Sequence, residues 1–158
     1  MQAQQTQFSL GAGAGVPIGT FDDVVKVGWQ VSGAVSFSPP DLPVSFQASA
    51  NYAQFSDETP LDIKAQIIYG TADAVYRFRS ALSTRFRPYL ISGLGLYNSK
   101  DIGDDAFGDS ATKLGINLGA GFNFRVARAE LFLESRFHDV FTEGPNVKFV
   151  PLTVGLRF

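Results

Sequence analysis

The stretch KLGINLGAGFNF, residues 113–124, decides the fold class of this chain of 158 residues. Its even positions are apolar: Leu114, Ile116, Leu118, Ala120, Phe122 and Phe124. Its odd positions are polar or small: Lys113, Gly115, Asn117, Gly119, Gly121 and Asn123. A period of two places successive side chains on opposite faces of a strand, whereas a helix repeats every 3.6 residues. The stretch is therefore predicted to be a β-strand with one apolar and one polar face.

Seven further segments alternate in the same way, which gives eight predicted strands in all. They are residues 7–18, 29–37, 44–52, 65–79, 88–98, 130–138 and 150–158. In residues 88–98 the sequence does not decide which face is the apolar one, because Leu90, Leu94 and Leu96 lie on one face and Tyr89, Ile91 and Tyr97 on the other. The predicted strands are close to the length of about 9–11 residues that a tilted membrane-spanning strand needs.

The composition agrees with strands and turns and excludes several classes of protein. The chain has 15 Phe, 5 Tyr and 16 Gly but no Cys and a single His, Met and Trp. Without Cys it forms no disulfide and no thiol site. A net charge of −2 gives no basic face for nucleic acid. No apolar run approaches the ~20 residues of a membrane-spanning helix.

The predicted connections alternate in length along the chain. Those after the second, fourth and sixth strands are short: 39–42, 80–85 and 126–128. Those after the first, third, fifth and seventh strands are longer and more polar: 19–27, 56–64, 99–111 and 142–147. Ten of the 15 acidic residues fall in these longer connections. An up-and-down meander places alternate connections at opposite ends, so one domain over residues 1–158 with a short-turn end and a long-loop end is predicted.

The polar faces favour a membrane barrel over a soluble one. A soluble barrel turns its apolar face inward and covers the other face with charge. Here the polar faces consist mainly of Gly, Ser, Gln, Asn and Thr, which suit the narrow interior of eight strands. Aromatic residues near the predicted strand ends fit the interfacial girdles of such a barrel. They are Trp29, Phe37, Tyr52, Tyr76, Phe78, Phe124 and Phe158.

A few charged residues fall on the faces assigned to the lumen. They are Asp73, Arg77, Lys113, Glu130, Glu134, Arg136, His138 and Arg157. Isolated buried charges are too costly to keep, so these residues are expected to form a paired network. Glu134 is expected to bridge two or more of the cations Lys113, Arg136 and Arg157.

The last strand, residues 149–158, ends on an outward-facing Phe. It resembles the C-terminal signature that outer-membrane proteins present to their assembly machinery, carried here by Val154, Leu156 and Phe158, although Gly155 departs from the commonest form. Residues 87–97 and 115–124 resemble strands of the small outer-membrane β-barrel family that includes OmpA and OmpX relatives. The resemblance implies a bacterial outer-membrane location, eight antiparallel strands and periplasmic termini. It does not imply a single function.

The sequence offers two candidate chemical sites, and each has a plainer interpretation. Some small outer-membrane barrels are lipid A deacylases with a Ser–His–acid site, and this chain offers Ser135, His138 and Glu134. Alternation places Ser135 and His138 on opposite faces, so a lumenal histidine is predicted instead of an enzyme. The acidic stretch 101–109 lacks the spacing of an EF-hand, and a solvated loop is expected there instead of a calcium site.

The sequence thus predicts an all-β, eight-stranded antiparallel up-and-down transmembrane β-barrel with a structural or surface-interaction role. No enzyme activity, cofactor or metal is expected. Outer-membrane lipid and, through the C-terminal strand, the barrel-assembly machinery are the expected partners. Because residues 1–5 are polar, the signal peptide is expected to have been removed. The alternative is a small-ligand-binding barrel, soluble or membrane-embedded, with a cavity lined by Tyr69, Phe132 and Phe149.

Overall fold

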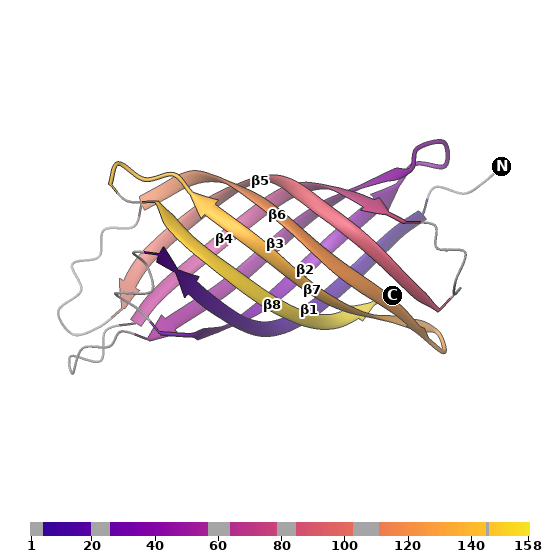
Figure 1. Cartoon of the computed structure of the whole chain (residues 1–158), viewed down its shortest axis with the longest axis horizontal. Helices are drawn as coiled ribbons and strands as arrows, with labels where there is room; N and C mark the ends of the chain where they lie inside the picture. Colours follow the sequence, from indigo (N-terminus) through magenta and orange to yellow (C-terminus); the bar gives the residue numbers. More distant parts are fainter. Residues whose placement is uncertain (1–4, 20–25, 57–63, 79–84, 103–110, 145) are drawn as a thin grey trace.

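The computed structural model describes residues 5–19, 26–56, 64–78, 85–102, 111–144 and 146–158. These ranges contain eight strands: β1 (Gln5–Ile18), β2 (Gly28–Ser38), β3 (Val44–Ser56), β4 (Lys64–Arg77), β5 (Phe86–Ile102), β6 (Ala111–Val126), β7 (Ala129–Val140) and β8 (Val147–Arg157). Each strand pairs with the next, and β1 also pairs with β8, so the sheet closes into a barrel (Figure 1). The predicted eight-stranded antiparallel barrel is confirmed.

The barrel has two different ends. The start of β1 and the end of β8 lie at the right in Figure 1, together with the ends of β2, β4 and β6 and the starts of β3, β5 and β7. We call this the turn end, and we call the opposite end the loop end. The shortest connection, Ala127 and Arg128 between β6 and β7, includes the positive φ of 54° at Ala127. A tight hairpin turn requires such a left-handed residue.

The alternation of β6 turns its even positions outward, as predicted. Leu118 is 61 % exposed, whereas Asn117 and Asn123 are buried inside the barrel. The structure also shows which face of β5 points outward: Leu90, Leu94 and Leu96 are exposed on the outer wall. Tyr89, Ile91 and Tyr97 point inward and are each 1 % exposed.

Some strands are longer than their alternation indicated. β5 spans 17 residues where 88–98 was predicted. The added residues pair on both sides, with Ser99 opposite Ala111 of β6 and Ile102 opposite Lys64 of β4. Every strand of a closed barrel has two neighbours, so backbone pairing continues for as long as either neighbour offers a partner.

The outer wall is apolar around its whole circumference. Leu10, Leu94, Leu118, Leu133 and Val154, from five different strands, are all exposed. A soluble monomer rarely exposes a continuous apolar surface of more than a few hundred Å². Among the described residues, no helix is long and apolar enough to cross a membrane.

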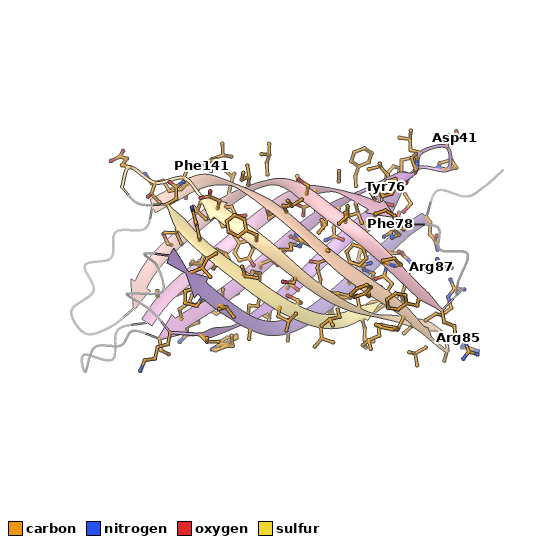
Figure 2. All side chains as sticks on the ribbon, in the orientation of Figure 1. Asp41, Tyr76, Phe78, Arg85, Arg87 and Phe141 are labelled. Atoms are coloured by element: carbon orange, nitrogen blue, oxygen red, sulfur yellow. The ribbon has the colours of Figure 1, made fainter. Side chains whose placement is uncertain are left out.

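Aromatic side chains gather on this wall near the strand ends. The rings of Trp29 and Tyr52 lie 5.4 Å apart between their centroids, towards the loop end. Tyr76 and Phe78 meet edge to face at the turn end, with a centroid distance of 5.0 Å (Figure 2). These positions match the girdles in which amphipathic rings contact the membrane interface.

Candidate functional site

Four charged side chains meet inside the barrel and form a balanced quartet. They are Asp73 of β4, Glu134 and Arg136 of β7, and Arg157 of β8. Arg136 pairs through Nη1 with Asp73 Oδ2 at 3.0 Å and through Nε with Glu134 Oε1. Arg157 Nη2 lies 3.9 Å from Glu134 Oε2. All four side chains are at least 90 % buried, so two cations and two anions neutralise one another away from water.

Uncharged groups also hydrogen-bond to the quartet, although the buried Nε of Arg157 has no partner among the described residues. Tyr89 donates its hydroxyl to Glu134 Oε2 at 2.6 Å, and Asn117 donates Nδ2 to Asp73 Oδ1 at 2.8 Å. Thr71 donates to Asp73 Oδ2 at 2.5 Å. Arg157 Nη1 donates to Asn123 Oδ1 at 2.7 Å. Each carboxylate oxygen of the quartet therefore has a partner, as a charge in low dielectric requires.

A second group of hydrogen bonds crosses the lumen beside the quartet. Tyr69 of β4 donates to Gln30 Oε1 of β2 at 3.0 Å. Gln30 Nε2 donates in turn to Thr153 Oγ1 of β8 at 2.5 Å. These contacts join strands that are not neighbours in the sheet, so they tie opposite walls of the barrel together.

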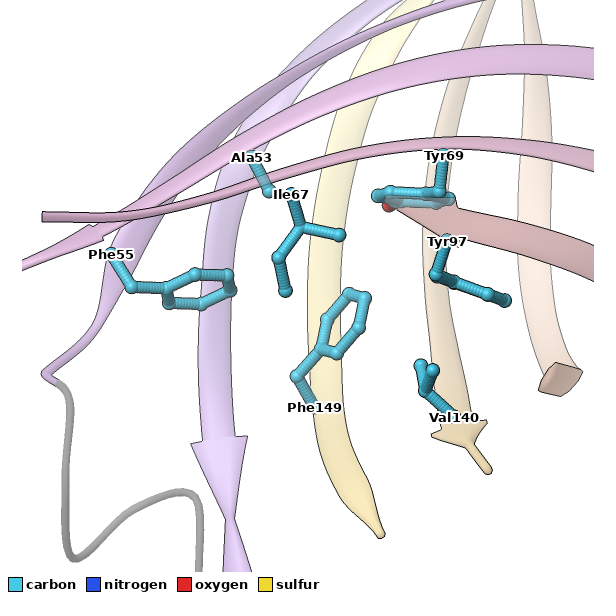
Figure 3. Packing of buried hydrophobic residues seen from close by; sticks show 7 residues of the cluster. All are labelled: Ala53, Phe55, Ile67, Tyr69, Tyr97, Val140 and Phe149. Carbon is cyan, nitrogen blue, oxygen red and sulfur yellow. The ribbon is translucent and has the colours of Figure 1, made fainter. Parts of the chain in front are cut away.

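Packed aromatic rings fill the interior towards the loop end. The apolar cluster there comprises Ala53, Phe55, Ile67, Tyr69, Tyr97, Val140 and Phe149 (Figure 3). His138 packs beside it: its ring stacks on Phe149 with centroids 4.8 Å apart, and its Nδ1 lies 2.7 Å from the hydroxyl of Tyr97. Tyr69 and Phe149, two of the three residues that would line a ligand cavity, are therefore part of this packed cluster.

Little free volume is left between the quartet and the aromatic cluster. A cavity of about 20 Å³ lies there, bordered by Gln30, Tyr69 and Arg157. That is room for about one water molecule. Small-molecule sites are typically ~300 Å³ or larger. Phe132, the remaining candidate for a ligand cavity, packs against the guanidinium of Arg157, with 4.8 Å from Cζ to the ring centroid.

Glycines on β6, together with Gly95 of β5 itself, make room for the two large tyrosines of β5. A Cβ on Gly121 would lie 2.5 Å from the ring of Tyr89. A Cβ on Gly95 or on Gly115 would lie 2.7 Å from the ring of Tyr97. These glycines therefore leave space for a large inward side chain, from the adjacent strand at Gly115 and Gly121 and from the same strand at Gly95.

Three residues expected in the lumen network lie apart from the quartet. Lys113 is on the inner face of β6, but eight residues from Gly121, the partner of Glu134. At about 3.4 Å per residue this is roughly 27 Å along the strand, so Lys113 is not among the cations beside Glu134, which are Arg136 and Arg157. Glu130 lies opposite Arg125 and Arg157 in the backbone register, with no ion pair among the described residues. Arg77 donates instead to Ser45 at 2.5 Å and to Ser38 at 3.3 Å.

The expectations about a Ser–His site and a cation loop have different outcomes. His138 is 1 % exposed inside the barrel, whereas Ser135 lies on the outer side of β7. No hydrogen bond joins them within the described part of the chain, and the ring of His138 contacts Tyr97 and Phe149 instead. Residues 103–110, most of the acidic stretch, lie outside the described residues. Across the ranges that are described, no three His, Asp or Glu residues are arranged to hold a metal ion.

The expected network names only titratable residues, whereas four further residues also take part in it: Gln30, Tyr89, Asn117 and Asn123. The two asparagines lie on the inner face of the most regular strand, where an amide in an apolar-flanked lumen needs a polar partner. The sequence alone therefore indicated that these two asparagines have polar partners inside the barrel. Tyr89 could not be assigned, because its face was open in the sequence.

The C-terminal residues named as an assembly signal lie on the outer wall. Val154, Leu156 and Phe158 are 49 %, 47 % and 62 % exposed. The backbone N–H of Phe158 donates to the carbonyl of Phe8 at 2.9 Å, and that of Phe8 donates back at 2.9 Å. The last residue thus closes the seam between β1 and β8 with its backbone while its ring remains outside.

Comparisons with known proteins agree with this architecture. Neisserial surface protein A is similar in structure with a TM-score of 0.74 and 16 % identity, over 99 % of this chain and 98 % of that one. The N-terminal barrel domain of Pseudomonas aeruginosa OprF gives 0.60 and 18 %, over 99 % and 100 %. Ail of Yersinia pestis, in complex with the heparin analogue sucrose octasulfate, gives 0.56 and 16 %, over 98 % and 99 %.

At these identities the solved structures establish the fold alone. A comparison with curated proteins finds no match. The model of the outer membrane protein β-barrel domain matches residues 1–158, the full length of the chain. The apolar wall, the closed sheet of eight strands and this match lead to one conclusion. The chain belongs to the outer membrane protein β-barrel domain family.

Proposed function

We propose that the chain acts as one closed barrel domain, residues 1–158, with a structural or surface-interaction role and no enzymatic activity. Membership of the family indicates a bacterial outer membrane, where lipid surrounds the apolar wall. The observation that carries the proposal is the filled interior: the charged quartet and the aromatic cluster leave a cavity of only about 20 Å³. A barrel filled in this way anchors its loops in the membrane without passing solutes.

The filled interior leads to a prediction about conductance. Inserted into a planar bilayer, the protein should show no large, steady current, because the quartet and the packed rings block the lumen. Single-channel recording is the measurement, with a known porin reconstituted in the same lipid as the positive control. Porin-like openings from the purified monomer would contradict a closed barrel.

The loop end is the part of the molecule that could contact a surface partner. Nine of the 15 acidic residues fall between the strands that are connected at this end. The heparin analogue bound to Ail is a polyanion, and acidic loops would repel such a ligand. We therefore propose an uncharged or cationic surface partner for this chain.

We also propose that the barrel-assembly machinery recognises the C-terminal strand through Val154, Leu156 and Phe158. Deleting Phe158 should leave most of the chain unassembled in cells, because the exposed ring is the part of the signal that the assembly machinery would contact. Refolding of the purified variant into lipid vesicles should be affected less than assembly in cells, since it loses only the two backbone hydrogen bonds to Phe8. The measurement is the fraction of folded barrel in outer-membrane extracts, with Leu152→Ser, another outward apolar position on β8, as control. Equal assembly of wild type and the Phe158 deletion would refute the proposed signal.

A further inference from the structure

We propose that β7 and β8 open locally around Pro151, so that the barrel wall has a built-in point where water reaches the sealed interior. The proposed anchoring role makes no use of this proline. The eight strands of the described residues contain three prolines, Pro17, Pro88 and Pro151. A proline has no backbone N–H, so within a sheet it is normally confined to edges and bulges. A closed barrel has no edge strand, so the place of each proline in the ladders matters.

Pro151 removes a hydrogen bond from the ladder between β7 and β8. Backbone N–H groups alternate in direction along an antiparallel strand. The N–H of Phe158 donates to the carbonyl of Phe8, so the even residues of β8 donate to β1 and the odd residues donate to β7. The missing N–H of Pro151 therefore belongs to the ladder with β7, where the register of the flanking pairs places Arg136 opposite it.

The pairing of the two strands is interrupted at this point. The flanking pairs keep one register: Ser135 with Leu152, and His138 with Phe149. Between them, Arg136 and Phe137 have no paired residue on β8, although β8 stays paired with β1 along this stretch. The carbonyl of Arg136 thus lacks the N–H that a residue other than proline would offer from position 151. In a wall that faces lipid such a carbonyl is costly, because lipid offers no hydrogen bond in exchange.

The other two strand prolines lie where a ladder ends, so neither interrupts one. An odd residue of β1 directs its backbone N–H towards β2. The ladder between β1 and β2 ends at the pair Gly15–Gly28, however, two residues before Pro17 is reached. Pro88 is the third residue of β5 and precedes the paired range of β5 with β4. Pro151 is thus the proline that breaks a ladder with paired residues on both sides.

Side chains inside the barrel bridge the interruption. On its turn-end side, Glu134 of β7 lies 3.9 Å from Arg157 of β8. On its loop-end side, the ring of His138 of β7 stacks on that of Phe149 of β8, with centroids 4.8 Å apart. The interior cavity of about 20 Å³, which has room for a water molecule, borders Pro151. The two side-chain contacts therefore act as a latch over the gap in the ladder, and their release lets water from the cavity reach the backbone.

The test is residue-resolved amide hydrogen exchange, followed by NMR, on the full chain in phospholipid nanodiscs. We expect the amides of Arg136 and Phe149, beside the interruption, to exchange about tenfold or more faster than those of Glu134 and Thr153. The latter two belong to the uninterrupted part of the same ladder. Pro151→Val supplies the missing N–H with a strand-forming side chain. It should slow exchange at Arg136 and Phe149 by about tenfold, since a hydrogen bond to an otherwise unpaired carbonyl is gained.

Pro17→Val is the matched control. Pro17 is also a buried strand residue, but the N–H gained there has no partner on β2. Both substitutions loosen the unfolded chain in the same way, so this effect cancels in the comparison. Exchange at Arg136 should be the same in Pro17→Val as in wild type. Exchange at Val140, the last residue of β7, should not respond to Pro151→Val, which separates local opening from fraying of the strand end.

The latch is tested independently by His138→Ala, which removes the ring that stacks on Phe149. Exchange at Arg136 should become faster in this variant, while exchange at Thr153 stays as in wild type. This variant and the wild-type comparison decide the matter should Pro151→Val not fold. Equal protection of Arg136 and Thr153 in the wild type would overturn the proposal. Equal effects of the two proline substitutions, or unchanged exchange at Arg136 in His138→Ala, would overturn it as well.

Discussion

Replacing Glu134 with glutamine is expected to lower the free energy of unfolding by about 3–5 kcal/mol. Glu134 accepts from Tyr89 and Arg136 and is the carboxylate nearest to Arg157. Its neutralisation leaves two guanidiniums with only Asp73 as a buried counter-charge. Urea unfolding in lipid vesicles, followed by tryptophan fluorescence of the single Trp29, measures the loss.

Two comparisons isolate the buried charge as the cause. Glu143→Gln removes the same charge from an exposed connection at the loop end, where an ion pair is worth only ~0–1 kcal/mol. The double variant Glu134→Gln/Arg157→Gln restores electrical balance and should recover part of the loss. If Glu134→Gln and Glu143→Gln lose the same small amount, the interior network does not contribute as described.

Replacing Gly121 with alanine is expected to cost on the order of 3 kcal/mol. The new methyl group would lie 2.5 Å from the ring of Tyr89 and 2.7 Å from the carbonyl oxygen of Leu133. The tyrosine must move, which adds the strain of overpacking, about 1–3 kcal/mol, to the weakening of a hydrogen bond to a charged group.

Gly33→Ala is the matched control for this substitution. Gly33 also lies within a strand, but a Cβ there would meet only the side chain of Leu10, at 3.7 Å. The same unfolding measurement should give a change close to zero for this variant. An equally small loss of unfolding free energy for Gly121→Ala would show that the position of Tyr89 does not depend on the absence of a side chain at residue 121.

The alternation of polar and apolar residues was enough to predict the strands and most of their faces. In residues 113–126 of β6 and residues 152–157 of β8, apolar residues alternate with polar or glycine residues, so a shift of one position would turn the polar face towards lipid. The connections likewise predicted which strand ends meet at each end of the barrel. Both are local properties of the sequence, and the structure confirms the resulting fold.

The face of β5 could not be predicted, because leucine and tyrosine are both acceptable on a lipid-facing wall. What places Tyr89 and Tyr97 inside is the space above Gly121, Gly95 and Gly115. Two of these glycines lie on β6, and only the register between the strands reveals which residue faces which. Single-strand patterns carry no information about that register.

The partners within the interior were also beyond the sequence. Asp73 and Arg136 come from β4 and β7, which are not neighbours in the sheet, and meet only across the lumen. Lys113 lies on the inner face of β6 as expected, but it is far from Glu134 along the strand. Alternation gives the direction of a side chain and says nothing about its position along the barrel axis, so the expected set was too large.

The central claim is that an apolar wall faces lipid while the polar face is sealed inside. Because the chain has no cysteine, single spin labels can be placed on the wall at Leu94→Cys, Leu118→Cys and Val154→Cys, with Glu143→Cys as the solvent-exposed control. Electron paramagnetic resonance in lipid vesicles then compares collisions with oxygen, which dissolves in lipid, and with a water-soluble nickel chelate. The account predicts high oxygen and low nickel accessibility at the three wall positions and the reverse at residue 143. High nickel accessibility at all three wall positions would contradict a membrane-embedded barrel.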